Sequence, residues 1–137
     1  MRVSRVVPNV SSELFAASRD FYINMFDLVV SVEHDDWYLH LMAPDARSLN
    51  IGFVKPGHEL FAGRGPSAGP HSMVLTIEVD DVDDAYGRAQ RLDAEIALPI
   101  CNEDYGQRHF LVLDPNGLVL NVMSPLDPAM RSDPGLA

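Results

Sequence analysis

The order of predicted helices and strands repeats once along the chain, and this repeat constrains the fold more than any other feature. Each half reads as one strand, one helix and then three strands. In the first half these elements are expected at 3–10, 14–26, 28–34, 37–42 and 49–54. In the second half they are expected at 73–79, 82–92, 96–101, 107–113 and 118–123. The repeat therefore predicts two βαβββ modules in tandem, an α+β fold.

Both helices are predicted from apolar residues at helical spacing behind a residue that can cap the first turn. A serine precedes the first stripe, which consists of Leu14, Ala17, Phe21 and Met25. Asp80 is the expected cap of the second, which consists of Val82, Ala85, Ala89 and Leu92. The acidic residues that follow Asp80 favour a helix N-terminus over a metal site, because the helix dipole stabilises negative charge there.

The two modules are expected to form one domain spanning 1–137. Module 1 covers 3–55 and module 2 covers 72–124; a linker rich in Gly and Pro joins them at 56–71, and a tail follows at 125–137. A single module cannot bury both faces of its sheet and helix. We therefore expect the modules to pack together, with their curved sheets around a shared cleft.

Charge and cysteine content exclude several classes of function. Ten basic and twenty acidic side chains give a formal charge of -10, which repels nucleic acid and anionic membranes and attracts cations. No apolar stretch is long enough to span a bilayer. Cys101 is the only cysteine, so an internal disulfide cannot form, a Cys-based metal site is not expected, and we expect Cys101 to be inert. These features are typical of a soluble cytoplasmic protein.

Three short motifs make the chain resemble the vicinal oxygen chelate superfamily, which includes glyoxalase I, extradiol dioxygenases, epimerases and bleomycin resistance proteins. The segment 19–27 (RDFYINMFD) lies in the first predicted helix, and Val79-Asp80-Asp81 opens the second. The most specific motif is Tyr105-Gly106-Gln107-Arg108 followed by Asp114-Pro115-Asn116-Gly117. The resemblance covers residues 3 to 124 and implies paired βαβββ modules, often in a homodimer.

Metal-dependent members of that family bind a divalent cation through four side chains, one from the first and one from the last strand of each module. The resemblance places Arg5, Asn50, Val74 and Asn121 at these positions. A divalent metal needs deprotonated oxygen or neutral imidazole ligands, and the positive charge of an arginine in the shell repels it. No metal and no cofactor are therefore expected. Asn50 and Asn121 would then either tie neighbouring strands together or fix the polar groups of an organic ligand.

Eight residues are candidates for binding a small molecule. His40 and His109 lie in central strands, while His34, His58 and His71 are expected at the surface; His34 and His40 are not expected on one side of the sheet. Trp37 and Tyr38 offer flat rings for stacking, although Trp37 also suits a core. The full set is Trp37, Tyr38, His40, Asn50, Tyr105, Arg108, His109 and Asn121.

Of the branches of the family, the chain is most similar to the metal-free bleomycin resistance proteins. The resemblance implies sequestration of a cationic or aromatic natural product without catalysis. One alternative is an enzyme of the same fold: a lyase, isomerase or dioxygenase with a non-standard metal site at His40 or His109, or a metal-free acid-base catalyst. Another is an accessory domain that binds a partner protein, which an exposed apolar patch would favour.

Overall fold

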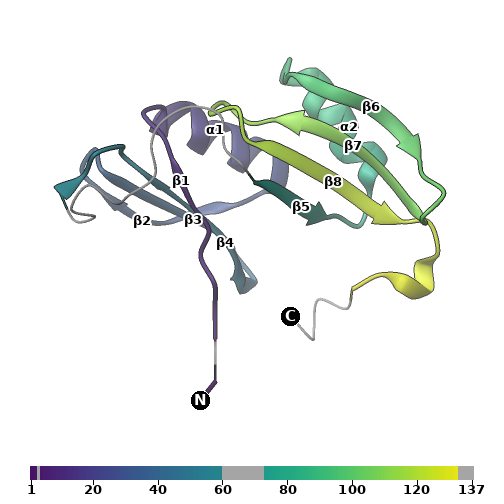
Figure 1. Ribbon diagram of the computed structural model, residues 1–137, viewed down its shortest axis with the longest axis horizontal. Coiled ribbons are helices and arrows are strands. Elements are labelled where there is room, and N and C mark those ends of the chain that lie inside the picture. Colours follow the sequence, from purple (N-terminus) through teal and green to yellow (C-terminus); the bar gives the residue numbers. More distant parts are fainter. Residues whose placement is uncertain (3, 60–72, 133–137) are drawn as a thin grey trace. The chain divides into compact units, whose positions relative to one another are not determined.

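The computed structural model describes residues 1–2, 4–59 and 73–132. The chain divides into two compact units, Met1–Gly69 and Pro70–Leu136. Of the predicted linker 56–71, only residues 56–59 lie within the described part of the chain, and the rest lies outside it. Each unit contains one helix and one four-stranded sheet (Figure 1).

The first unit is built in the predicted βαβββ order. Its elements are β1 (Asn9–Ser11), α1 (Phe15–Phe26), β2 (Val29–His34), β3 (Tyr38–Ala43) and β4 (Ala46–Val54). The strands lie in the order β1-β4-β3-β2. β1 and β4 are parallel, whereas β2, β3 and β4 are antiparallel neighbours. Because β1 pairs with β4, the first and last strands of the unit lie side by side.

The core of the first unit lies between α1 and one face of this sheet. Tyr22 packs its ring against that of Phe53, with 5.3 Å between centroids, and Leu39 and Leu41 are fully buried. The predicted helical stripe is partly wrong, because Leu14 and Ala17 are exposed. The residues of α1 that are buried are Ser18, Tyr22 and Met25.

Ser18 explains why apolar spacing misjudged the buried side of α1. Its hydroxyl lies 3.5 Å from that of Ser12, so a polar side chain is accommodated in the core by a hydrogen bond. Ser12 also accepts a hydrogen bond from the Leu14 backbone N–H at 2.9 Å. A serine therefore supports the start of the helix, but from two residues before the N-cap position, which Leu14 itself occupies.

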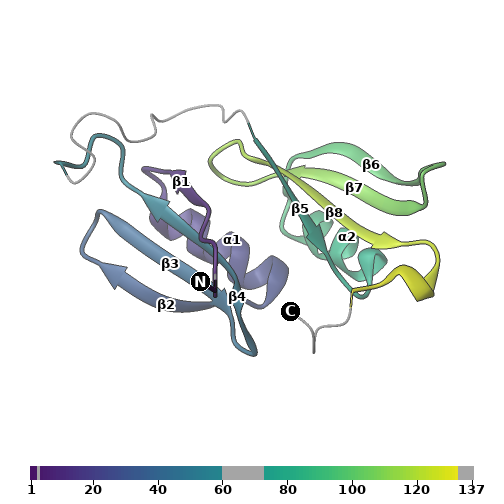
Figure 2. The same cartoon turned by 60° about the horizontal axis from the view of Figure 1, so that its bottom comes forward.

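The second unit repeats the arrangement. Its elements are β5 (Val74–Glu78), α2 (Val82–Arg91), β6 (Ile96–Asn102), β7 (Gln107–Leu113), β8 (Val119–Pro125) and a short 3-10 helix, η2 (Pro128–Met130). The strand order is β5-β8-β7-β6, with β5 and β8 parallel (Figure 2). The predictions of an α+β fold and of tandem βαβββ modules are confirmed.

In α2, Val82, Ala85 and Ala89 are buried as predicted, whereas Leu92 is exposed. The ring of Phe110 on β7 meets that of Tyr86 edge-on, with 5.0 Å between centroids. The predicted cap, Asp80, is wrong by one residue. The N-cap is Asp81, whose side chain accepts a hydrogen bond from the Asp84 backbone N–H at 3.0 Å.

The first strand is much shorter than predicted. β1 begins at Asn9 rather than at residue 3. Pairing with β4 starts where the Gly52 N–H donates to the Pro8 carbonyl at 2.8 Å. Proline has no N–H of its own to continue the ladder toward the N-terminus. Among the described residues, 4–8 therefore have the composition of a strand but do not form one.

The first part of the predicted tail is ordered on the second unit. β8 extends to Pro125, and η2 follows it. Ser132 then donates from both its backbone N–H and its hydroxyl to the Glu78 carboxylate, at 2.8 and 3.0 Å. Residues 133–137 lie outside the described part of the chain. None of the described helices is both long enough and apolar enough to cross a bilayer.

Candidate functional site

Each sheet has one face against its helix and one face turned away, which we call the helix-free face. Alternate residues of a strand point to opposite faces. In the first unit, Leu39 and Leu41 face the helix, so Tyr38, His40 and Met42 lie on the helix-free face of β3. Cross-strand partners share a face, which places Asn50 and Gly52 of β4 beside them.

His40 and Asn50 form a hydrogen-bonded pair on the helix-free face of the first unit. Nε2 of His40 lies 2.8 Å from Oδ1 of Asn50. The Asn50 amide nitrogen donates to the carbonyl oxygens of Val6 and Ser48, at 3.2 and 3.0 Å. These two bonds orient the amide so that its oxygen faces the histidine, and an amide oxygen can only accept. His40 therefore carries its proton on Nε2 when neutral.

The second unit contains the same pair at the corresponding place. Nδ1 of His109 lies 2.8 Å from Oδ1 of Asn121, and the Asn121 amide nitrogen donates to the Thr76 hydroxyl at 3.3 Å. His109 is buried. Nε2 of the same ring lies 3.2 Å from Oε1 of Glu103, so the ring is held between an amide and a carboxylate.

The strand registers show that the two pairs are equivalent. His40 is level with Gly52 on β4, and His109 is level with Met123 on β8. In each unit the asparagine stands two residues before that partner, so the hydrogen bond runs diagonally between adjacent strands. The sequence singled out all four residues, and the structure brings them together within each unit as two pairs.

The positions inferred for a family metal site differ in part from the observed register. Thr76 on β5 is level with Asn121, whereas Val74 is level with Val119. Arg5 precedes β1 and lies outside the sheet. The polar group opposite Asn121 is thus a neutral hydroxyl. Oδ1 of Asn50 and Oδ1 of Asn121 are both within hydrogen-bond distance of a histidine.

Aromatic rings line the first unit beside the His40–Asn50 pair. Tyr38 stacks with His40 and with His34, at interplanar angles of 10° and 26°. The expectation that His34 and His40 would not share a side is wrong, because His34 is the cross-strand partner of Tyr38. Partial burial raises the pKa of the Tyr38 hydroxyl, and the positive charge of Arg5 opposes this rise.

Trp37 lies at the hairpin end of this row of rings. Its ring stacks on His58 with 4.2 Å between centroids and an interplanar angle of 17°. It also stacks on His34, at 5.7 Å and 11°. Trp37 is half-buried.

Cys101, Glu103 and His109 converge at the end of the β6–β7 hairpin. Oε1 of Glu103 lies 3.2 Å from both the Cys101 sulfur and Nε2 of His109. The hydrogen bond to Glu103 raises the pKa of the Cys101 thiol, and burial and the Glu103 charge add to this rise. The hydrogen bonds from Cys101 and His109 lower the pKa of Glu103.

Sequence reasoning treated Cys101 and His109 separately and missed Glu103. Cys101 and His109 are cross-strand partners, and Glu103 follows Cys101 by two residues. The register of the hairpin is the signal that could have found the group. Tyr105, at the hairpin turn, is exposed and meets the His109 ring edge-on at 6.2 Å between centroids. Burial raises its pKa, as do the nearby Glu103 and Cys101.

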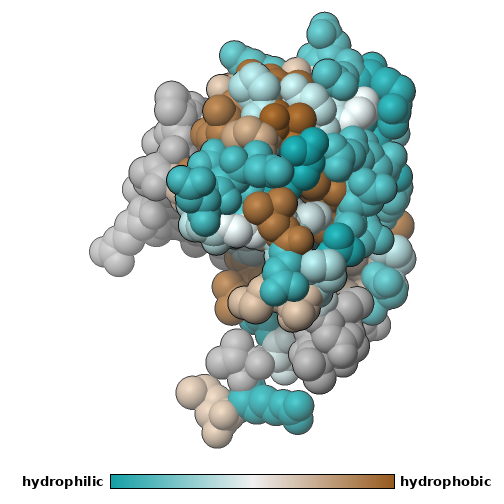
Figure 3. Space-filling model, turned by 90° about the vertical axis from the view of Figure 1, so that its right-hand side faces the viewer, coloured by the Kyte–Doolittle hydropathy of each residue, from teal (hydrophilic) through white to brown (hydrophobic). Residues whose placement is uncertain are grey.

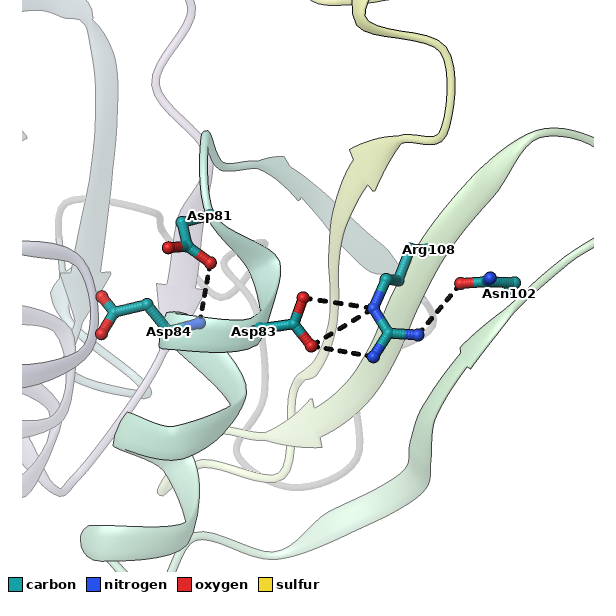
Figure 4. Close-up of polar contacts among 5 residues, drawn as sticks. All are labelled: Asp81, Asp83, Asp84, Asn102 and Arg108. Carbon is teal, nitrogen blue, oxygen red and sulfur yellow. Dashed lines mark hydrogen bonds and ion pairs between the residues drawn. The ribbon is translucent and has the colours of Figure 1, made fainter.

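Arg108 lies on the helix side of β7, away from His109. Its guanidinium donates to both carboxylate oxygens of Asp83 in the first turn of α2, with a shortest distance of 2.8 Å, and to Asn102 at 3.0 Å (Figure 4). The hydrogen bonds raise the pKa of Arg108 and lower that of Asp83. Arg108 therefore links β6, β7 and α2, and its contact with a ligand stays a prediction.

Hydrophilic residues cover most of the surface shown in Figure 3, and hydrophobic residues reach it in groups separated by polar side chains. Large apolar side chains that are exposed in the second unit include Leu92, Leu126 and Met130. They come from α2 and from the segment after β8. Val74 on β5 is also exposed and, two residues before Thr76, lies on the same face of the sheet as Asn121.

Comparison with solved structures shows the fold. TioX from Micromonospora sp. ML1 matches with a TM-score of 0.71 and 19% identity over 90% of this chain and 100% of that one. Lactoylglutathione lyase from Agrobacterium tumefaciens matches with a TM-score of 0.71 and 15% identity, over 90% of this chain and 95% of that one. A glyoxalase/bleomycin resistance protein/dioxygenase family enzyme from Burkholderia phytofirmans PsJN matches with a TM-score of 0.70 and 22% identity, over 88% of this chain and 97% of that one.

Comparison with curated protein sequences gives no significant match. The sequence model of one family, in contrast, matches residues 10–122, which includes both βαβββ modules and both His–Asn pairs. That family is described as the glyoxalase/bleomycin resistance protein/dioxygenase superfamily. With this match over most of its length and with the tandem fold, the chain belongs to the glyoxalase/bleomycin resistance protein/dioxygenase superfamily.

Proposed function

We propose that this protein binds a cationic, aromatic small molecule on the helix-free faces of its sheets and sequesters it without a chemical step. Binding would need no metal at the four positions inferred from the family. The observation that carries the proposal is the repeated pair, in which the amides of Asn50 and Asn121 are held by His40 and His109. Amide and imidazole groups can orient an organic ligand through hydrogen bonds.

The first unit supplies a surface suited to an aromatic ligand. The rings of Tyr38 and His40 are almost parallel, and Gly52 on the neighbouring strand has no side chain. An added Cβ at Gly52 would collide with the Asn9 side chain and lie 2.9 Å from the Tyr38 hydroxyl. Glycine thus leaves the Tyr38 hydroxyl and the Asn9 amide close together, beside a flat ring on which another ring can stack.

The charge of the chain supports a cationic ligand. With a formal charge of -10, the protein raises the local concentration of cations and speeds their encounter. The faces of Tyr and Trp rings also attract cations. Trp37 and Tyr105 are accessible at the edges of the two units, and we assign them to ligand contacts as well. Cytoplasmic location and a homodimeric state form part of the same proposal.

Calorimetric titration of the metal-stripped chain tests this function, with bleomycin as the first ligand and other cationic antibiotics after it. Removing one stacking ring costs about 0.5–1.5 kcal/mol, so Tyr38→Ala and Trp37→Ala should each weaken binding by about two- to tenfold. Leu92→Ala, at an exposed apolar residue at the C-terminal end of α2, is the control and should leave the affinity unchanged. Unchanged affinity in both ring variants would refute the assigned surface.

An enzyme of the same superfamily is the second candidate. The observation that favours it is the convergence of Cys101, Glu103 and His109, since one version of this alternative uses a non-standard metal site at His109 and the other uses acid-base side chains. The two functions differ in the fate of the ligand. Sequestration returns the compound unchanged after prolonged incubation, as mass spectrometry would show, whereas a lyase, isomerase or dioxygenase converts it.

A further inference from the structure

We propose that Cys101, Glu103 and His109 form a binding site for a divalent cation of the zinc class, with Sγ, a carboxylate oxygen and Nε2 as ligands. The site goes beyond the proposed function, because ligand binding on the helix-free faces does not require it. It also differs from the positions inferred from the family, which are Arg5, Asn50, Val74 and Asn121.

The geometry fits a tetrahedral ion. The three ligand atoms lie within 4.8 Å of one another, and two of the separations are 3.2 Å. Zinc bonds of about 2.0–2.3 Å place tetrahedral ligand atoms about 3.3–3.8 Å apart, so small side-chain movements suffice. A mixed set of sulfur, nitrogen and oxygen suits zinc and cobalt better than magnesium or calcium. Three protein ligands leave the fourth position to water.

The hydrogen bond from His109 to Asn121 prepares the ring for this role. It holds the ring so that Nε2 points at the Glu103 carboxylate. In the metal-free chain a proton joins Nε2 to the Glu103 oxygen at 3.2 Å, and a divalent cation can take the place of that proton. Histidines that bind metals are oriented in this way, with the other ring nitrogen donating to a fixed acceptor.

The backbone holds the ligands in place before any ion binds. The Glu103 N–H donates to the Gln107 carbonyl at 2.7 Å, and the Gly106 N–H donates to the Glu103 carbonyl at 3.0 Å. Gly106 has a positive φ of 96°, which a glycine adopts without strain. The tight turn places Cys101 and His109 opposite each other on β6 and β7.

The first unit provides an internal comparison. His40 corresponds to His109, and its partner on the outer strand β2 is Val32, where the second unit has Cys101. The first unit thus repeats the His–Asn pair without the thiol. The Cys101→Val variant gives the second unit the residue that the first already carries, so it is expected to fold.

Cobalt titration of the metal-stripped, reduced full chain tests the site. On binding, the thiol proton of Cys101 passes to the solvent and the thiolate bonds to Co²⁺. We expect a thiolate-to-cobalt absorption band in the near ultraviolet that saturates at one ion per chain and disappears when Zn²⁺ is added. Cys101→Val should abolish the band, and Glu103→Gln should weaken binding by about tenfold or more.

His40→Gln is the matched control, because it disrupts the pair in the unit that lacks a thiol, and it should leave the band intact. The melting temperature gives a second readout: Zn²⁺ should raise it in the wild type and in His40→Gln but not in Cys101→Val. Absence of the band from the wild type, or equal Zn²⁺ stabilisation of the wild type and Cys101→Val, would overturn the proposal. Neither outcome depends on whether an organic ligand binds the metal-stripped chain.

Discussion

Nδ1 of His109 lies 2.8 Å from Oδ1 of Asn121, and the equivalent pair in the other unit, His40 and Asn50, has the same separation. Both histidines are buried, with 6% and 4% of their surface exposed. A buried N–H must find an acceptor, and in each unit the asparagine supplies it. The two asparagines therefore have a structural role in addition to any contact with a ligand.

Replacing Asn121 with leucine should destabilise the fold. The substitution leaves the N–H of His109 without an acceptor, and a buried unsatisfied donor costs about 1–3 kcal/mol. Urea unfolding measures the loss. Adding His109→Phe to Asn121→Leu should recover part of it, because removing both polar partners costs less than leaving one unpaired. A single variant as stable as the wild type would show that the hydrogen bond does not form.

The identity of the helix cap is testable with two neighbouring aspartates. Asp81→Ala removes the acceptor of the Asp84 N–H and should lower the free energy of unfolding by about 1 kcal/mol. Asp80→Ala is the matched control, since it removes the same charge one residue earlier. Thermal unfolding compares the variants, and a larger loss from Asp80→Ala would contradict the observed start of α2.

The ion pair of Asp83 with Arg108 makes part of the stability depend on pH. Since the pKa of Asp83 is lowered in the folded chain, its stabilisation is present above the unfolded pKa of about 3.9 and is lost as the pH falls below that value. Asp83 is largely exposed, so solvent screening limits the effect to about 0.2–1 kcal/mol.

Unfolding of Asp83→Asn at pH 7 and pH 3 in the absence of metal measures this contribution. The wild type should be the more stable of the two at pH 7, and the difference should shrink at pH 3. Asp36→Asn offers a comparison in the first unit, where Lys55 holds the pKa of Asp36 down without a helix terminus nearby. A stability difference that grows toward pH 3 would have the wrong sign for a lowered pKa.

Gly52→Ala should disturb the helix-free face of the first unit. The added methyl group would displace the Asn9 side chain and press against the Tyr38 hydroxyl. Asn9 is exposed and can rotate, so we expect a loss of stability at the low end of the range of about 1–3 kcal/mol for added methylenes, together with weaker ligand binding. Titration calorimetry of the folded variant measures ligand binding separately from the loss of stability. A ligand affinity equal to that of the wild type would show that the ligand binds elsewhere.

The sequence predicted the fold well because alternation and turn residues are local signals. The strand at 107–113 was predicted with the bounds of β7, and the Asp114–Gly117 turn joins it to β8. The predicted bounds were wrong for β1, because Pro8 has no N–H to pair with β4 although the residues around it are apolar. The buried side of α1 was misjudged because Ser18 is buried by virtue of a hydrogen bond, which apolar periodicity does not register.

The candidate site was only partly predictable. His40, His109, Asn50 and Asn121 stood out as polar residues in apolar strands, but their pairing depends on strand register, which the sequence does not specify to one residue. Because the register was unknown, the sequence also did not reveal that Thr76 lies opposite Asn121 or that Glu103 lies beside His109. Arg108 was grouped with the ligand-binding residues on the strength of a motif, whereas its position on β7 turns it toward Asp83 and α2.

The most direct test of the account is the melting temperature of the metal-stripped protein in the presence of bleomycin and other cationic aromatic antibiotics. A ligand that binds only the folded state at a hundred times its dissociation constant adds about 2.7 kcal/mol of stability, a shift that is easily detected. We predict that at least one of these compounds raises the melting temperature without added metal. Stabilisation that requires a divalent metal as well as the compound would contradict the account.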